Sequence, residues 1–238
     1  MPPGNAGSGL SRRLLGVAVL ALTGFVVLAL LAAAHQLSTL DHQTRALVHL
    51  TRLPLLDPAM NGVSGLGEHY GLIPLMTLGV AVLWRPRRRW AMVLPLLMAG
   101  TGALQLVAKC AIDRPRPNLA AWGFPSGHVL SLVVFFGLMT YLLASSTLAR
   151  PRRWLGYAGC AATVLAVAFS RLYLEAHWVT DVAGGFTLGL AYLLLASCLV
   201  ETLARRRAAA SPQGSEAQVH LADDEGRGAD VDSVVVAV

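Results

Sequence analysis

The sequence has 238 residues, of which 55% are hydrophobic and only 13% are charged, and its mean hydropathy is +0.58. Soluble domains carry roughly a quarter charged residues, so this composition excludes an ordinary soluble domain and indicates a membrane protein. The net charge of +6 would suit a nucleic-acid-binding protein, but the arginines cluster at the ends of apolar segments. That distribution indicates membrane topology, and no nucleic-acid partner is expected.

Six charge-poor segments follow one another along the chain. They comprise residues 14–34, a run ending in 72–84, and residues 90–108, 129–148, 154–170 and 182–200. A transmembrane helix needs about 20 apolar residues, which five of the six segments reach. The second is short unless it begins near Gly65. The first is longer than the apolar part of a signal peptide, which favours a retained helix over a cleaved leader. The sequence therefore predicts an all-α, integral-membrane bundle of six transmembrane helices.

The segment between the first two apolar runs, residues 35–70, has Leu40, Leu47, Leu50 and Leu53 at near-helical spacing with polar residues between them. This pattern predicts an outer interfacial amphipathic helix followed by a glycine-rich loop. Two roles are open for it: a lid or substrate-guiding surface, or a simple connector.

Four arginine clusters lie at alternate ends of the apolar segments. They are Arg12 with Arg13, Arg85 with Arg87–Arg89, Arg150 with Arg152 and Arg153, and Arg205–Arg207. Because basic loops stay on the cytoplasmic side, we predict a multi-pass protein of the cell (inner) membrane with both termini in the cytoplasm. The opposite helix ends then face outwards.

Most of the reactive side chains lie at those outward-facing ends. Lys109, the only lysine of the chain, ends the third apolar segment, and Arg-Pro-Arg-Pro follows at 114–117. The prolines fix the backbone, so this stretch presents guanidinium groups from a stiff strand. Ser126, Gly127 and His128 open the fourth segment, where the free amides of a helix N-terminus can bind an anion. Gly127 would let a ligand approach the backbone closely.

The last polar group consists of Arg171, His177 and Asp181. His177 and Asp181 are four residues apart, so in a helix they share one face, and the carboxylate can orient the imidazole as a nucleophile. Cations, helix-terminal amides and two histidines are typical of phosphoryl transfer, in which catalysis is mostly positioning and electrostatic stabilisation. Asp113 and Glu175 are the only other acids nearby in the sequence, and they are isolated. We therefore expect no metal and no cofactor, with fixed cations in the metal's place.

These motifs resemble the signatures of the phosphatidic acid phosphatase type 2 superfamily, which also includes the vanadium haloperoxidases. The matching residues are Lys109 with Arg116-Pro117, Pro125-Ser126-Gly127-His128, and Ser170-Arg171 with His177 and Asp181. The motifs span residues 109–181, and the six-helix layout extends the resemblance to roughly residues 10–203.

The resemblance implies a role for each matched residue. His177 would be the nucleophile that forms a phosphohistidine, Asp181 would orient it, and His128 would protonate the leaving group. The phosphate oxygens would be held by Lys109, Arg116, Ser126, Gly127 and Arg171.

The activity that the resemblance implies is a metal-independent membrane phosphatase acting at the outer leaflet on a lipid phosphate or diphosphate. Undecaprenyl diphosphate or a phosphatidic-acid-like lipid is the favoured substrate. One alternative is a lipid phosphotransferase with an alcohol as acceptor. Another is a non-catalytic lipid-phosphate binding or transport protein, against which the intact His128, His177 and Asp181 argue.

Three further features leave alternatives open. Arg114 would be an auxiliary or headgroup contact, or a surface charge. Glu175 would disfavour a second anionic group, or would be a solvated loop residue. The Gly185–Gly189 spacing permits close helix contact, which is favoured inside the molecule over a homodimer. We expect one membrane phosphatase domain, residues 1–203, and a disordered cytoplasmic tail, residues 204–238.

Overall fold

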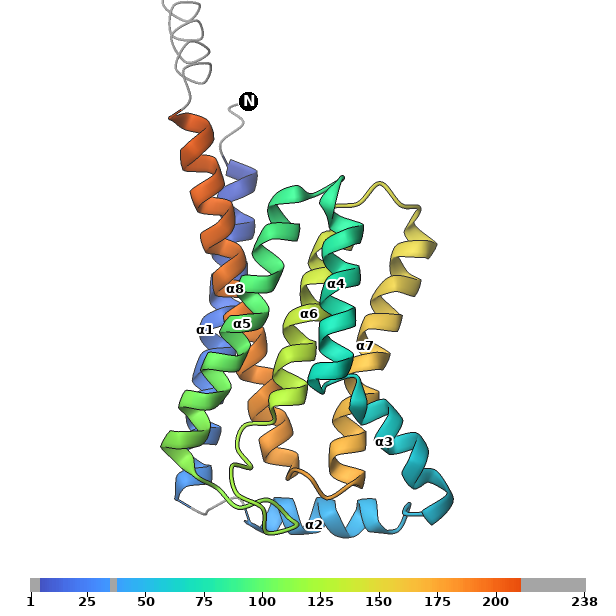
Figure 1. Cartoon of the computed structure of the whole chain (residues 1–238). Coiled ribbons are helices and arrows are strands. Elements are labelled where there is room, and N and C mark those ends of the chain that lie inside the picture. Colours follow the sequence, from blue (N-terminus) through green and yellow to red (C-terminus); the bar gives the residue numbers. More distant parts are fainter. Residues whose placement is uncertain (1–4, 35–37, 211–238) are drawn as a thin grey trace, which may run out of the picture. The chain divides into compact units, whose positions relative to one another are not determined.

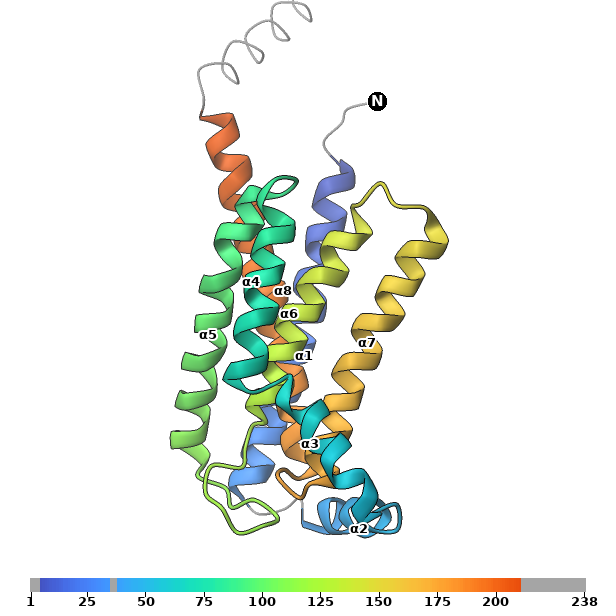
Figure 2. The same ribbon diagram turned by 45° about the vertical axis from the view of Figure 1, so that its right-hand side comes forward.

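The structure, a computed structural model, describes residues 5–34 and 38–210, and all regular elements in these residues are helical (Figures 1 and 2). The predicted all-α class is therefore confirmed. The elements are α1 (Asn5–Ala33), α2 (Ser38–His49), the 3-10 helix η1 (Pro54–Leu56), α3 (Asp57–Gly65), α4 (His69–Trp84), α5 (Arg88–Ile112), α6 (Gly127–Ala144), α7 (Arg150–Tyr173) and α8 (Val179–Ala209).

The chain divides into two compact units, Met1–Leu195 and Ala196–Val238. The first unit contains α1 to α7 and the start of α8, and it holds every residue of the predicted site. The described part of the second unit is the C-terminal end of α8. The predicted tail beyond residue 210 lies outside the described residues.

Five described helices are long and apolar enough to cross a membrane, namely α1, α5, α6, α7 and α8. The sixth candidate span is divided. α4 has only 16 residues, and it reaches spanning length only together with Pro54–Gly65, from which it is bent by 47°. The second apolar segment, which is short in the sequence, is thus interrupted in the structure by a break between α3 and α4.

The outer segment differs in part from the prediction. α2 is the expected amphipathic helix, but the predicted glycine-rich loop is wrong, because residues 57–65 form α3. This helix begins with an acidic residue, Asp57, and has a proline in its first two positions, both of which favour a helix N-terminus. Packing against α7 holds it in place despite its two glycines.

α6 is the central helix of the first unit. It packs against both α5 and α7, and its apolar residues are buried all round. A helix that is hydrophobic on every side belongs in a core. Val129, Leu132 and Val133 of α6 form that core with Val164 and Val167 of α7. The first turn of α6, where three predicted site residues lie, is therefore surrounded by other elements.

α8 packs closely on α6 through its glycines. A Cβ at Gly185 would collide with the backbone carbonyl of Ser126, and one at Gly189 would lie 2.9 Å from the Leu130 carbonyl oxygen. The Ser126 amide also donates a hydrogen bond to the Asp181 carbonyl, at 2.9 Å. The favoured reading of the glycine spacing, packing inside the molecule, is confirmed. A homodimer stays a prediction.

The α6–α8 contact predicts the effect of Gly185→Ala. The methyl group would push α8 away from Ser126, and overpacking of this kind typically costs about 1–3 kcal/mol. We expect a lower thermal unfolding midpoint in detergent. Gly159→Ala is the matched control, because a Cβ on Gly159 of α7 meets nothing within 4 Å. Equal midpoints for the two variants would contradict the close packing of α6 on α8.

Candidate active site

The predicted site residues come together from five places in the first unit. Lys109 lies in the last turn of α5, Arg116 in the loop that follows, His128 in the first turn of α6, Arg171 in the last turn of α7, and His177 just before α8. These groups are close enough to interact electrostatically. Lys109, Arg116 and Arg171 interact with the His128 imidazole, and Arg116 and Arg171 also interact with the His177 imidazole. The structure therefore forms one cationic cluster around two histidines.

Unsatisfied buried polar atoms are concentrated in this cluster. Six such side-chain atoms among the described residues lack a hydrogen-bond partner, and four of them belong to the predicted site: Arg116 Nε, Ser126 Oγ, Arg171 Nε and His177 Nδ1. Buried polar groups are nearly always paired, so a cluster of unpaired ones calls for an explanation. Two guanidinium donors and a hydroxyl suit a ligand rich in acceptor oxygens, such as phosphate, while His177 Nδ1 faces Asp181.

Arg171 is held from one side by a residue that the motifs do not include. Its side chain is buried, and Nη1 donates to Ser64 Oγ at 2.6 Å. Ser64 belongs to α3, which packs against α7. This contact fixes the guanidinium and leaves Nε free.

The first turn of α6 has the form expected of an anion site. Ser126 is the N-cap residue, but its hydroxyl makes no capping bond, and the helix begins at Gly127. The amides of this turn have no partners within the helix, and the helix dipole favours negative charge there. The expected approach of a ligand to Gly127 stays a prediction, and the structure adds a second reason for the glycine. A Cβ at Gly127 would collide with the side-chain amide of Gln105 on α5, so the close approach involves a neighbouring helix.

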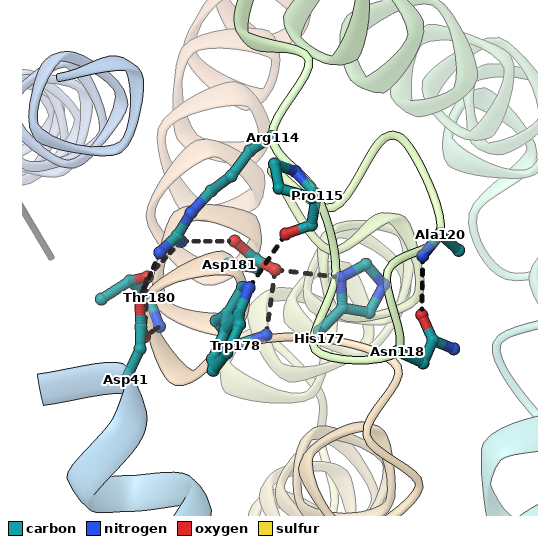
Figure 3. A network of polar contacts seen from close by, with 9 residues as sticks. All are labelled: Asp41, Arg114, Pro115, Asn118, Ala120, His177, Trp178, Thr180 and Asp181. Atoms are coloured by element: carbon teal, nitrogen blue, oxygen red, sulfur yellow. Dashed lines mark hydrogen bonds and ion pairs between the residues drawn. The ribbon is translucent and has the colours of Figure 1, made fainter. Parts of the chain in front are cut away.

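His177 lies in the loop before α8, which begins at Val179. The expectation that His177 and Asp181 share one helical face is therefore wrong, although the two side chains still meet (Figure 3). His177 Nδ1 is 3.4 Å from Asp181 Oδ2, a distance longer than that of a good hydrogen bond. Asp181 Oδ2 also accepts a hydrogen bond from the Trp178 amide, at 3.0 Å, so the loop is wrapped around this carboxylate.

The environment of His177 keeps its imidazole neutral. The side chain is almost completely buried, and burial lowers its pKa. Asp181 opposes this shift, while Arg171 and Arg116 add to it. The net direction is downwards, so the ring is unprotonated at neutral pH. A neutral ring next to a carboxylate has the protonation state that a nucleophile needs.

His128 has a partner that the sequence did not reveal. Its Nε2 lies 3.0 Å from Glu68 Oε1. Glu68 is the N-cap residue of α4, in the turn that joins α3 to α4. A Cβ on the preceding Gly67 would collide with the imidazole, so this turn packs directly on His128. In the sequence, Glu68 is an acid at the margin of an apolar segment, with nothing to connect it to residue 128.

The reading of Arg114 as a surface charge is wrong, because its side chain is only 7% exposed and faces inwards. Its reading as an auxiliary or headgroup contact stays a prediction. It donates to Asp181 Oδ1 at 2.9 Å and forms an ion pair with Asp41 of α2 (Figure 3). Its carbonyl accepts a hydrogen bond from the Gly123 amide, which closes the loop after α5. Arg114 thus forms ion pairs inside the protein, whereas Arg116 belongs to the cationic cluster, although only one proline separates the two residues.

The reading of Glu175 as a solvated loop residue is also wrong, while its effect on a second anionic group stays a prediction. Its carboxylate accepts hydrogen bonds from Arg45 and contacts His49, and Arg52 lies 4.0 Å away. Burial disfavours the charged form, but the hydrogen bonds from His49 and Arg45 outweigh this and lower the pKa of Glu175. Glu175 therefore fastens α2 to the loop before α8.

The fold and the site together define an integral-membrane helical protein with a cluster of cations and two histidines at one end of its helices. The PAP2 superfamily model matches residues 90–205. Phosphatidylglycerophosphatase B of Bacillus subtilis is 31% identical to this chain over 192 residues, which are 77% of this chain and 94% of the relative. An undecaprenyl-diphosphatase of Sulfolobus acidocaldarius is 27% identical over 60% of this chain and 70% of its own length.

A solved structure agrees with these matches. The crystal structure of the transmembrane PAP2-type phosphatidylglycerolphosphate phosphatase from Bacillus subtilis has a TM-score of 0.70 and 27% identity, covering 78% of this chain and 96% of that one. The chain belongs to the PAP2 superfamily, and it is a membrane lipid phosphatase. The resemblance, the fold class and the enzyme class expected from the sequence are confirmed.

The position of Lys109 predicts the effect of Lys109→Arg. The half-buried ammonium is a compact charge near Arg116 and Arg171, and a planar guanidinium would crowd both. A displacement of about 1 Å at a reacting centre can cost on the order of 100-fold in rate. We therefore expect phosphate release to fall about 100-fold with folding preserved. Arg85→Lys, at the C-cap of α4, is the control that should keep full activity. Near-normal turnover in Lys109→Arg would show that charge alone matters.

Proposed function

We propose that this phosphatase hydrolyses a lipid phosphate monoester through a phosphohistidine formed on His177. The observation that supports this most strongly is the convergence of unpartnered buried groups of Arg116, Ser126 and Arg171 beside the buried His177. Such groups suit the spread negative charge of a transferring phosphoryl group.

The reaction consists of two displacements at phosphorus. In the first, a nitrogen of His177 attacks, the bond to the lipid oxygen breaks, and that oxygen takes a proton from His128. In the second, His128 takes a proton from water, the resulting hydroxide oxygen bonds to phosphorus, and the N–P bond breaks to release inorganic phosphate. Asp181 stabilises the positive imidazole of the intermediate. Lys109, Arg116, Ser126, Gly127 and Arg171 hold the oxygens in both steps, so no step requires a metal ion.

An apolar groove next to the site suits a lipid tail. It has a volume of about 250 Å³ and lies between α4 and α5. Leu72, Ile73, Met76 and Met98 line it, and its polar lining includes Gln105, the residue that packs on Gly127. His69, which follows Glu68 in the chain, also lines this groove. A tail bound here would bring its phosphate to the first turn of α6.

Glu68 favours a monoester over a diphosphate. Any leaving oxygen protonated by His128 lies beside the Glu68 carboxylate, which repels an anionic leaving group such as a lipid phosphate. An alcohol leaving group carries no such charge. The phosphatidylglycerophosphatase relative supports a glycerophospholipid phosphate as substrate. Undecaprenyl diphosphate, which the sequence favoured, is the second candidate and is supported by the Sulfolobus relative.

We place the site on the extracytoplasmic face of the membrane. Within the first unit, three arginine clusters lie at the start of α1, at the α4–α5 turn and at the start of α7. The site is formed at the opposite ends of α5 and α7 (Figure 1). Basic helix ends stay in the cytoplasm, so the site faces outwards.

The test is phosphate release by purified protein in detergent containing EDTA, with phosphatidylglycerophosphate, phosphatidic acid and undecaprenyl diphosphate in parallel. We expect full activity in EDTA, with the monoesters turned over faster than the diphosphate. His177→Asn should abolish release from all three lipids. Loss of activity in EDTA that Mg²⁺ restores would refute the metal-free mechanism, and turnover by His177→Asn would refute the phosphohistidine.

A second prediction concerns Glu68→Gln. The amide no longer stabilises a protonated His128, so release from phosphatidylglycerophosphate should fall about tenfold, part of the 10²–10⁴ that general acid catalysis contributes. Undecaprenyl diphosphate has a better leaving group, and in Glu68→Gln that anionic leaving group is no longer repelled by a carboxylate. The turnover of undecaprenyl diphosphate should therefore stay equal or rise. Asp113→Asn removes an exposed acid at the C-cap of α5 and is the charge-matched control. Equal losses on both lipids in Glu68→Gln would exclude this role.

A further inference from the structure

A buried chain of charges extends from Asp181 on the side away from His177 (Figure 3). Asp181, Arg114 and Asp41 are 0%, 7% and 1% exposed. Arg114 Nη1 donates to Asp181 Oδ1 at 2.9 Å, and Nη2 pairs with Asp41 Oδ2. Thr180 joins the chain, since its hydroxyl accepts from Arg114 at 2.7 Å and donates to Asp41 at 2.9 Å. The phosphoryl-transfer steps above use only Asp181 from this chain.

We propose that Asp41 of α2 is a positioning residue that acts through Arg114: it orients the Asp181 carboxylate and keeps the buried charge beside His177 negative. This inference rests on the proposed function, in which His177 becomes positively charged when it bonds to phosphorus. The family motifs place no residue in α2, so the assignment adds a sequence-distant element to the site.

The orientation follows from how the two oxygens of Asp181 are used. Oδ1 accepts from Arg114, while Oδ2 accepts from the Trp178 amide and faces His177 Nδ1. A rotation of the carboxylate would break both sets of contacts. Arg114 cannot move independently, because Asp41 and Thr180 bind it and its guanidinium lies 5.8 Å from the centre of the Trp178 ring. The Trp178 indole is fixed in turn by its hydrogen bond to the Pro115 carbonyl, at 2.9 Å.

The charge argument is separate from the geometry. Arg114 alone would cancel Asp181 and weaken its support for a cationic imidazole. Asp41 supplies a second carboxylate, so the three buried groups carry a net charge of −1 if Asp41, Arg114 and Asp181 are all ionised. In a poorly hydrated interior, such a charge acts strongly over a few ångströms.

The surroundings of His177 make this negative charge necessary. From α7 and the loop after α5 it meets positive groups, and α6 contributes another imidazole. The described charged and titratable groups around it are Arg171 of α7, Arg116 of the loop, His128 of α6, Asp181 of α8, and the Arg45–Glu175 pair that joins α2 to its own loop. Without Asp41, the balance of this group shifts towards positive charge.

Asp41 also fixes the start of α8. Its Oδ1 accepts from the Thr180 amide at 3.1 Å, which satisfies a free donor of the first turn. α2 is therefore more than a simple connector, and a role as a lid or substrate-guiding surface stays a prediction. It forms one side of the proposed active site and, through Arg114, holds Asp181, the partner of the proposed nucleophile His177.

The experiment is Asp41→Asn in the full-length protein, assayed in detergent with phosphatidylglycerophosphate and undecaprenyl diphosphate across pH. The asparagine keeps the size and can still bind Thr180, but it removes one negative charge. In metal sites, mutating a residue that orients a ligand through a hydrogen bond typically lowers affinity or activity about 10–100-fold. By analogy, we expect Asp41→Asn to lower kcat by about that factor with KM little changed. Because less negative charge surrounds His177, the acidic limb of the kcat/KM profile should move to lower pH.

Two further variants separate this role from simple docking of α2. His49→Ala weakens the other tether of α2, its contact with Glu175, while every carboxylate near His177 stays in place, so its acidic limb should stay where the wild-type limb lies. Asp41→Asn combined with Arg114→Gln restores the net charge of −1, so its acidic limb should return towards the wild-type position even if kcat stays low. An unshifted limb in Asp41→Asn, the same shift in His49→Ala, or a double variant shifted as far as Asp41→Asn would each overturn the proposal.

The same assay separates failure of this inference from failure of the proposed function. An active His177→Asn, or wild-type protein that yields no alkali-stable, acid-labile phosphoenzyme with ³²P-labelled lipid, would refute the function itself. An inactive His177→Asn together with an unshifted Asp41→Asn would refute only the role of Asp41.

Discussion

The contact between the start of α6 and the start of α8 is the constraint on which the site depends. The Ser126 amide donates to the Asp181 carbonyl, and the missing side chain at Gly185 leaves room for the Ser126 carbonyl. Because both helices begin at this joint, the free amides of α6 and the loop that carries His177 face the same point. The cations reach that point from other elements. Under the proposed function, the position of the phosphate is therefore set by helix packing, which is more rigid than any single loop.

Cations gathered at the end of a helix bundle repel one another, and the fold offsets this with acids that lie outside the family motifs. Asp41 forms an ion pair with Arg114, and Glu68 contacts His128. Glu175 forms an ion pair with Arg45 of α2. Asp41 and Glu68 belong to the segment between the first two spans, and Glu175 binds that same segment. A buried charge without a partner is far more costly than a paired one. Under the proposed function, the outer segment thus contributes side chains to the active site.

The membrane class, the helices and the convergence of the motif residues could be predicted because each depends on local sequence or on the membrane itself. A run of apolar residues gives a span, and alternate crossings bring Lys109, Ser126 and Arg171 to one surface. The partners of Arg114 and Glu175 could not be predicted. Asp41 lies 73 residues from Arg114, and Arg45 lies 130 residues from Glu175, so no periodic pattern links them. The glycines of α3 were misleading for a related reason, since packing on α7 overrides local propensity.

The break in the second span explains how two of these distant contacts arise. The bend of 47° between Pro54–Gly65 and α4 turns the chain towards the site. It lets Ser64 reach Arg171, which a phosphate ligand would share, and it presses Glu68 against His128. The next residue, His69, already lines the groove between α4 and α5. Under the proposed function, the α3–α4 turn therefore contacts Arg171, which holds the phosphate, and His128, which donates the proton, and it adjoins the groove for the lipid tail. A tail that moved this turn would also move the proton donor.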